Sequence, residues 1–153
     1  MSDGGGDEVR VHPVGVFEQR VAAQDTELRL PMLLLRDEAG REVHIPIGSC
    51  DGFAIHIALT QQPVARPLTH DLGLHLLEKL SAHLEHVVID AFTEQGCRAT
   101  LSIGASDGTH TLQARAGDGI ALALRAELPI YMTQEVLEQA SSTPGPEEGQ
   151  ESL

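Results

Sequence analysis

Three aspartates stand directly before apolar stretches of this sequence and are expected in the first turn of a helix: Asp51, Asp71 and Asp118. A carboxylate at such a position is stabilised by free backbone N–H groups and by the helix dipole. The same carboxylates could instead hold a divalent cation, Mg²⁺ or Mn²⁺, that activates water at a phosphodiester. The residue types leave both interpretations open, so Asp51, Asp71 and Asp118 are candidate metal ligands.

The densest group of polar residues is the segment RPLTHDL at positions 66–72. Arg66 could bind a phosphate or a carboxylate through its planar guanidinium. His70 could act as a general acid or base, or as a metal ligand, and together with Arg66 and Asp71 it forms the candidate catalytic group. The alternative is an ordinary helix start that is capped by Thr69.

Arg66 and Arg115 are the candidate substrate-binding residues, because each guanidinium could bind a phosphate. Asp71 would repel an anion near His70 unless a metal ion or Arg66 neutralised its charge. We therefore predict that Arg66 and Asp71 are paired, directly or through the region of Arg115 and Asp118.

The composition limits the kind of protein that could position these residues. The chain has 153 residues, with 10 Lys and Arg against 23 Asp and Glu, a formal charge of −13, and 41% hydrophobic residues. This length and apolar content suit one domain with one core. Aromatic residues make up 3% of the chain, which argues against stacking of single-stranded nucleic acid. The acidity argues against a passive phosphate-binding surface.

The sequence shows neither a membrane span nor an export signal. No apolar run approaches about 20 residues, and the N-terminal residues are neither cationic nor apolar. Cys50 and Cys97 form no CxxC pair. We expect a cytoplasmic protein with reduced thiols and no membrane partner.

The first half of the body predicts strands followed by a helix. Pro13 cannot donate to a sheet ladder, so the first strand is expected at an edge. Ser49 is the expected N-cap of a helix whose apolar body, 53–59, should be buried all round. Period-two alternation of apolar residues places the strands at 9–16, 28–34 and 43–47.

The second half predicts a similar series. A helix capped by Thr69 carries one expected apolar face, formed by Leu72, Leu76, Leu77, Leu80 and Leu84. Two further helices are expected at 117–125 and from Thr133 to about residue 140. Strands are expected at about 85–92, 101–103, 109–115 and 130–132.

The sequence contains an internal repeat. DGFAIHI at 51–57 and DGIALAL at 118–124 share the pattern Asp-Gly-apolar-Ala-apolar-x-apolar, and each follows an expected hairpin. We predict a duplicated β-β-β-α unit whose two helices are related by an approximate two-fold axis. The alternative is coincidence between two helices that are rich in Ala and Leu.

Four segments together resemble the bifunctional nuclease family: IPIG at 45–48, AI at 54–55, RPLTHDL at 66–72 and RAGDGIALA at 115–123. The resemblance covers about residues 9–140, and RPLTHDL matches the family pattern without a change. It implies a mixed α+β domain, oligomers, and hydrolysis of DNA and RNA.

The chain departs from the family pattern at two places. Asp51 stands where the family usually has Glu, which shortens the reach toward a metal or a base. The family's RPSDAI is RAGDGI here, at 115–120, and the loss of Pro and Ser leaves the more flexible Gly117 as the cap. The chain therefore resembles a diverged paralogue.

These observations predict a single α+β domain at 9–140, with a mixed, largely antiparallel sheet and packed helices. The acidic segments 1–8 and 141–153 are expected to be disordered. One function hypothesis is metal-assisted hydrolysis of phosphodiester bonds in DNA and RNA. The other is a non-catalytic oligomeric module that binds a small anion or a protein partner at helix N-termini.

A homo-oligomer, most simply a dimer, is expected in either case. The residues at 32–35 are all apolar, so both faces of this strand need a cover. The sequence predicts few helices, and one set of these side chains is therefore expected to lack a partner within the chain.

Overall fold

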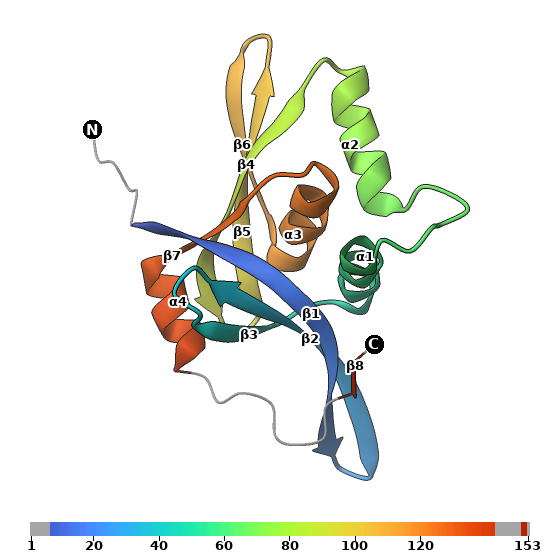
Figure 1. Cartoon of the computed structure of the whole chain (residues 1–153), viewed down its shortest axis with the longest axis vertical. Coiled ribbons are helices and arrows are strands. Elements are labelled where there is room, and N and C mark those ends of the chain that lie inside the picture. The colour runs from blue at the N-terminus through green and yellow to red at the C-terminus, as the bar shows by residue number, and fades with distance from the viewer. Residues whose placement is uncertain (1–6, 143–150, 153) are drawn as a thin grey trace.

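The computed structural model describes residues 7–142 and 151–152 of the chain. These residues form an α+β protein built on one mixed sheet (Figure 1). The strands are β1 (Glu8–Ala23), β2 (Thr26–Asp37), β3 (Glu42–Pro46), β4 (His83–Thr93), β5 (Gly96–Ala105), β6 (Gly108–Arg115), β7 (Ile130–Thr133) and β8 (Glu151–Ser152). The helices are α1 (Ser49–Thr60), α2 (Thr69–Lys79), α3 (Ala116–Arg125) and α4 (Gln134–Ser141).

The strand order is β3-β2-β1-β7-β4-β5-β6, and β8 pairs with β1. Strands β4 and β7 pair in parallel, whereas the other pairs among the described residues are antiparallel. In chain order, a meander of β1–β3 precedes α1, and a meander of β4–β6 precedes α3. The duplicated unit stays a prediction. Its test is a superposition of 27–60 on 97–126, in which a different strand order or helix placement would contradict it.

Strand β1 lies in the interior of the sheet, between β2 and β7, so the expectation of an edge strand is wrong. The register with β2 shifts between Pro13 and Gly15. Pro13 is paired with Leu35 and Gly15 with Leu34, so Val14 is the extra residue of a bulge next to the proline. Proline within a sheet is typically found at a bulge or an edge, and here the bulge accommodates it.

The helices α1, α2 and α3 lie together, whereas α4 lies apart from them (Figure 1). Helix α3 packs against α1 and α2 and against strands β4 and β5. Gly119 allows close packing of α3 on the sheet, because a Cβ at this position would lie 3.1 Å from the Ala99 Cβ and 3.2 Å from Leu101 and Val87 side-chain atoms. The largest buried side chains of the core are Leu33, Leu35, Ile45, Ile55, Ile89, Ile120, Ile130, Met132 and Leu137.

The expected leucine face of α2 is confirmed only in part. Leu72, Leu76 and Leu80 are 55%, 56% and 77% exposed, so the prediction is wrong for them. Leu77 packs against the core as expected, but together with Leu74, and Leu84 is buried as part of β4. Leucines are so frequent in this helix that their count alone does not identify the buried side.

Two other burial expectations are corrected. Helix α1 is not buried all round, because Phe53 is 55% exposed. In β2, Leu33, Leu34 and Leu35 are buried within the chain and Met32 is half-buried, so the uncovered face expected at 32–35 is not found. Leu28 and Leu30 of the same strand are 47% and 44% exposed, and the dimer remains a prediction.

Parts of the two terminal segments belong to strands and a helix. Glu8 begins β1, Ser141 ends α4, and Glu151–Ser152 form β8. The expected bounds of the domain and the disorder of its terminal segments stay predictions. Residues 1–6, 143–150 and 153 lie outside the described residues. Within the described part of the chain, no helix has both the length and the apolar character needed to cross a membrane.

Candidate functional site

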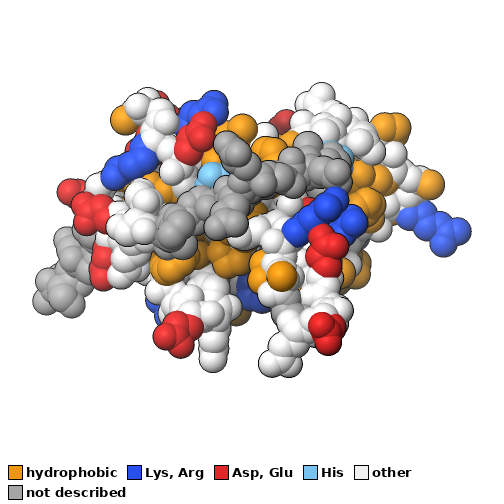
Figure 2. Space-filling view, turned by 90° about the horizontal axis from the view of Figure 1, so that it is seen from below, with side chains coloured by type: hydrophobic (Ala, Val, Ile, Leu, Met, Phe, Trp, Pro, Cys, Tyr) orange, Lys and Arg blue, Asp and Glu red, His pale blue; other side chains and the backbone are white. Residues whose placement is uncertain are grey.

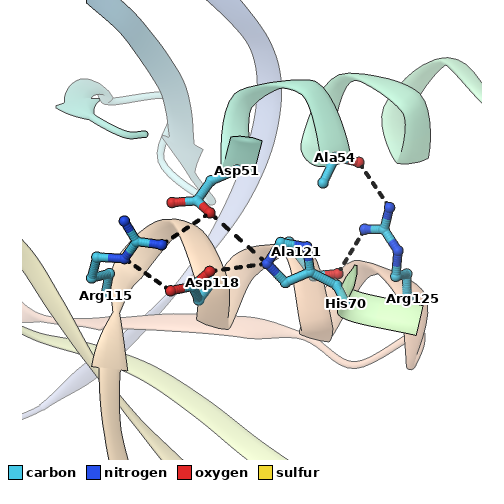
Figure 3. A network of polar contacts seen from close by, with 7 residues as sticks. All are labelled: Asp51, Ala54, His70, Arg115, Asp118, Ala121 and Arg125. Atoms are coloured by element: carbon cyan, nitrogen blue, oxygen red, sulfur yellow. Dashed lines mark hydrogen bonds and ion pairs between the residues drawn. The ribbon is translucent and has the colours of Figure 1, made fainter. Parts of the chain in front are cut away.

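The first turns of α1, α2 and α3 bring Asp51, His70 and Asp118 together (Figure 3). His70 Nε2 lies 3.0 Å from Asp118 Oδ1 and 3.9 Å from Asp51 Oδ1. The side chains of Asp51 and His70 are 3% and 10% exposed, whereas that of Asp118 is 30% exposed. Three of the residues selected from the sequence thus share one partly buried cluster, which we call the Asp-His-Asp cluster.

Local sequence explains why the two aspartates lie at helix starts. The N-cap residues Gly48 of α1 and Arg115 of α3 make no side-chain capping hydrogen bond. The acidic residue in each first turn, Asp51 or Asp118, is therefore the group that complements the positive end of the helix dipole. The expected side-chain caps Ser49 and Thr69 lie one residue inside their helices, and that expectation is wrong.

Helices α1 and α3 approach closely because position 117 has no side chain. A Cβ on Gly117 would lie 2.6 Å from Asp51 Oδ2 and 2.9 Å from its Cγ. Real Cβ atoms do not approach other atoms this closely, so the position of the Asp51 carboxylate requires glycine at 117.

Arg115 bridges the two carboxylates from the solvent side. Its Nε lies 3.0 Å from Asp118 Oδ2, and a terminal guanidinium nitrogen lies 3.5 Å from Asp51 Oδ1. The Arg115 side chain is 70% exposed, so the guanidinium also faces water. Its pKa is raised, first by the hydrogen bond to Asp118 and then by the charges of Asp51 and Asp118.

The pKa values of the two aspartates are shifted in opposite directions. The pKa of Asp51 is raised, because burial penalises its charged form and Asp118 lies beside it. Burial acts in the same direction on Asp118, but hydrogen bonds from Arg115 and His70 outweigh it and lower the pKa of Asp118. The cluster therefore holds Asp118 ionised more readily than Asp51.

The donor set of the cluster fits a divalent cation. One atom from each of Asp51, His70 and Asp118 lies within 4.8 Å of the other two. Ligands of one ion lie roughly 3 to 4 Å apart when each is about 2.1 Å from it. Carboxylate oxygens suit Mg²⁺ and Mn²⁺, and imidazole widens the choice to other transition metals.

A pocket of about 520 Å³ opens over the cluster. Its polar wall is formed by Asp51, His70, Asp118 and Arg115, and Phe53 is among the apolar residues that line it. Most small-molecule and cofactor sites combine a largely apolar lining with a few convergent polar groups.

Asp71 lies outside the Asp-His-Asp cluster, although it is the neighbour of His70. Its Oδ1 accepts a hydrogen bond from Arg125 Nε at 3.1 Å, and its Oδ2 accepts one from the Leu68 backbone N–H at 2.7 Å. Successive residues of a helix point about 100° apart, so Asp71 faces a different neighbour from His70. The structure gives Asp71 a role in the start of α2 rather than a place beside Asp51 and Asp118.

Arg66 is exposed on the segment that precedes α2. It lines a separate shallow hollow with His75 and Asp71, and among the described residues no hydrogen bond or ion pair joins it to another side chain. The expected pairing of Arg66 with Asp71 is therefore wrong, because Arg125 occupies the carboxylate of Asp71 from the buried side.

Sequence reasoning missed Arg125. Its side chain is 9% exposed and contacts Asp71, Ala121 and Ala54. The available signal is a single arginine that closes the otherwise apolar stretch 120–125, and an arginine is equally typical of the C-terminus of a helix.

The fold and the cluster define a class: an α+β protein in which three helix N-termini present two carboxylates and one imidazole beneath an exposed arginine. A family model described as "Bifunctional nuclease domain" matches residues 33–144, and the chain belongs to this family.

Two curated relatives come from Mycobacterium tuberculosis. They are "Uncharacterized protein MT1877" of strain CDC 1551 / Oshkosh and "Uncharacterized protein Rv1829" of strain ATCC 25618 / H37Rv. Each is 41% identical over 112 residues, which cover 72% of this chain and 66% of the relative. The match thus spans just under two thirds of these relatives.

Proposed function

We propose that this chain is a metal-dependent hydrolase of phosphodiester bonds in DNA and RNA. The observation that carries the proposal is the convergence of Asp51, His70 and Asp118 at three helix starts, with Arg115 beside them. Membership of the bifunctional nuclease domain family supports the same class of reaction.

Asp51, His70 and Asp118 would hold Mg²⁺ or Mn²⁺ through one atom each. When bound, such an ion supplies a Lewis acid for the phosphoryl oxygens and lowers the pKa of a coordinated water. His70 Nε2 faces both carboxylates in a nearly buried position, so we assign this atom to metal binding rather than to general acid or base catalysis.

Arg115 would bind the phosphate of the substrate. Its guanidinium is mostly exposed and already lies beside both carboxylates, so an incoming phosphate meets it at the mouth of the pocket. Guanidinium and phosphate form paired, charge-assisted hydrogen bonds. Two acidic groups and one arginine would repel a free anion without a cation, which is why the metal is part of the proposal.

Degradation of plasmid DNA and of RNA, each with Mn²⁺ or Mg²⁺ and with EDTA, tests this function. We expect hydrolysis that EDTA abolishes and that Asp51→Asn, His70→Gln and Asp118→Asn each reduce by about 100-fold or more. Asp107→Asn is the matched control, because Asp107 is exposed and its side-chain partner is His110, away from the cluster.

Equal degradation by all four variants would show a contaminating nuclease and contradict the proposal. The non-catalytic module is the other possible outcome. It would be favoured by a rise in Tm with inorganic phosphate and no response of Tm to Mn²⁺.

A further inference from the structure

Arg125 contacts all three helices that carry the Asp-His-Asp cluster. It ends α3, and its side chain is 9% exposed. Its Nε–H donates to Asp71 Oδ1 at 3.1 Å, and its terminal nitrogens donate to the Ala121 carbonyl at 3.1 Å and the Ala54 carbonyl at 3.2 Å. These acceptors belong to α2, α3 and α1, and Figure 3 draws the contacts to Ala54 and Ala121.

Each acceptor lies beside a residue of the cluster on the same helix. On α1 and α3 the acceptor follows the aspartate by three residues, which is about one helical turn. On α2 the acceptor is the next residue after the histidine. The pairs are Asp51 with Ala54, Asp118 with Ala121, and His70 with Asp71.

Asp71 extends the same network into the backbone. Its second oxygen accepts the Leu68 N–H at 2.7 Å, which fixes the start of α2. The guanidinium of Arg125 is therefore connected, through Asp71, to the turn that begins with Thr69 and carries His70. Its donors lie in one plane and reach three helices at once, an arrangement that the single ammonium of lysine cannot reproduce.

We propose that Arg125 and Asp71 form a positioning clamp that holds His70 at the observed distance from Asp51 and Asp118. The purpose of the clamp rests on the proposed function, because a metal ion requires all three ligands at fixed separations. The geometry of the clamp can be tested without added metal. Arg125 and Asp71 are thus positioning residues that act through His70 and lie outside the Asp-His-Asp cluster.

The test uses the full chain and two readouts: the ring resonances of His70 by NMR without metal, and the affinity for Mn²⁺ by calorimetry. Arg125→Lys keeps the charge and removes the three-way contact, whereas Asp71→Asn keeps an acceptor for the Leu68 N–H and removes the charge. Leu137→Ala is the control, because Leu137 is fully buried in α4 and lies outside the clamp.

We expect Arg125→Lys and Asp71→Asn to shift the His70 ring resonances and to weaken Mn²⁺ binding by about tenfold or more. Leu137→Ala should lower Tm and leave both readouts unchanged. The clamp is contradicted if the folded Arg125→Lys and Asp71→Asn proteins keep wild-type His70 resonances, or if Leu137→Ala shifts them equally. If the resonances shift in the two variants while the wild type binds no Mn²⁺, the clamp is supported and the metal-dependent function is not.

Discussion

Asp51 carries a charge that the fold disfavours. Burial and the neighbouring Asp118 raise its pKa, so ionised Asp51 destabilises the folded protein at neutral pH. At a pH below the ordinary carboxyl pKa of about 3.9, Asp51 is protonated in both the folded and the unfolded state. At such a pH, Asp51 no longer destabilises the fold. Asp51→Asn should therefore raise the free energy of unfolding at pH 7 by about 1 kcal/mol, and the gain should vanish near pH 3. Urea denaturation at several pH values measures it.

Asp118 should behave in the opposite way. Its pKa is lowered by Arg115 and His70, which outweigh burial, so ionised Asp118 stabilises the fold above the ordinary carboxyl pKa. This contribution is lost as the pH falls through the lowered pKa of the folded state. Asp118→Asn should thus be less stable than the wild type at pH 7. A loss of stability in both asparagine variants at pH 7 would contradict the difference between the two carboxylates.

Gly117 and Asp51 form one local arrangement. A Cβ at 117 would lie 2.6 Å from Asp51 Oδ2, so Gly117→Ala must displace a carboxylate that is 3% exposed. We expect a loss of about 1–3 kcal/mol in the free energy of unfolding and weaker Mn²⁺ binding. Gly73→Ala, also in a helix, meets only Leu122 Cδ2 at 3.5 Å and should stabilise by about 0.5–1 kcal/mol. Equal effects of the two changes on Mn²⁺ affinity would contradict this arrangement.

The close contact between position 117 and Asp51 involves two positions at which the chain departs from the pattern that the resemblance implies for the family: Asp51 in place of Glu, and Gly117 in place of Ser. A serine at 117 has a Cβ and would not fit the present position of the Asp51 carboxylate. We therefore expect the residue types at positions 51 and 117 to depend on each other.

Helix-start rules predicted Asp51, His70 and Asp118 from the sequence, because the start of a helix depends on neighbouring residues. These rules could not show that Asp118 belongs to the Asp-His-Asp cluster and that Asp71 does not. Both aspartates lie in the first turn of a helix, and only tertiary packing decides which residues each carboxylate faces. The contacts of Arg125 could not be predicted from the sequence either, because they also depend on tertiary packing. Two of its partners are 54 and 71 residues away in the chain.

Alternation and turn residues predicted most strands and hairpins of the sheet. They could not predict that β1 is internal, because the bulge after Pro13 is defined by pairing with β2. The prediction of which leucines of α2 are buried failed in part for a related reason. Leucines lie on more than one side of this helix, and its contacts with α3 and β4 decide which side is buried.

Helix α2 and its C-cap residue Leu80 carry an exposed stripe formed by Leu72, Leu76 and Leu80. A ridge of residues spaced by four is suited to packing against a copy of itself. We expect a dimer through this stripe, with a mass twice the 16.4 kDa of the chain by light scattering. Leu76→Gln should give a monomer, whereas Leu112→Gln, at an equally exposed leucine of β6, should not. A wild-type monomer at micromolar concentration would contradict the dimer.

The whole molecule is acidic, yet each described charge near the cluster has a defined partner (Figure 3). Figure 2, a view from below, shows acidic and basic side chains scattered among apolar ones rather than gathered by sign. Among the described residues seen in this view, there is no broad cationic track that would suit a nucleic-acid backbone.

The placement of β7 has a consequence for synthesis on the ribosome. Strand β7 pairs with β1 on one side and β4 on the other, and it connects the β1–β3 and β4–β6 meanders. Asp51 belongs to the first half, and His70 and Asp118 come after it, but all three precede β7 in the chain. A nascent chain halted before residue 130 lacks the strand that joins the two meanders into one sheet, so contact between the halves is left mainly to the packing of α1, α2 and α3. Protection of the sheet from protease should therefore increase once Ile130–Thr133 has emerged, after all three residues of the Asp-His-Asp cluster.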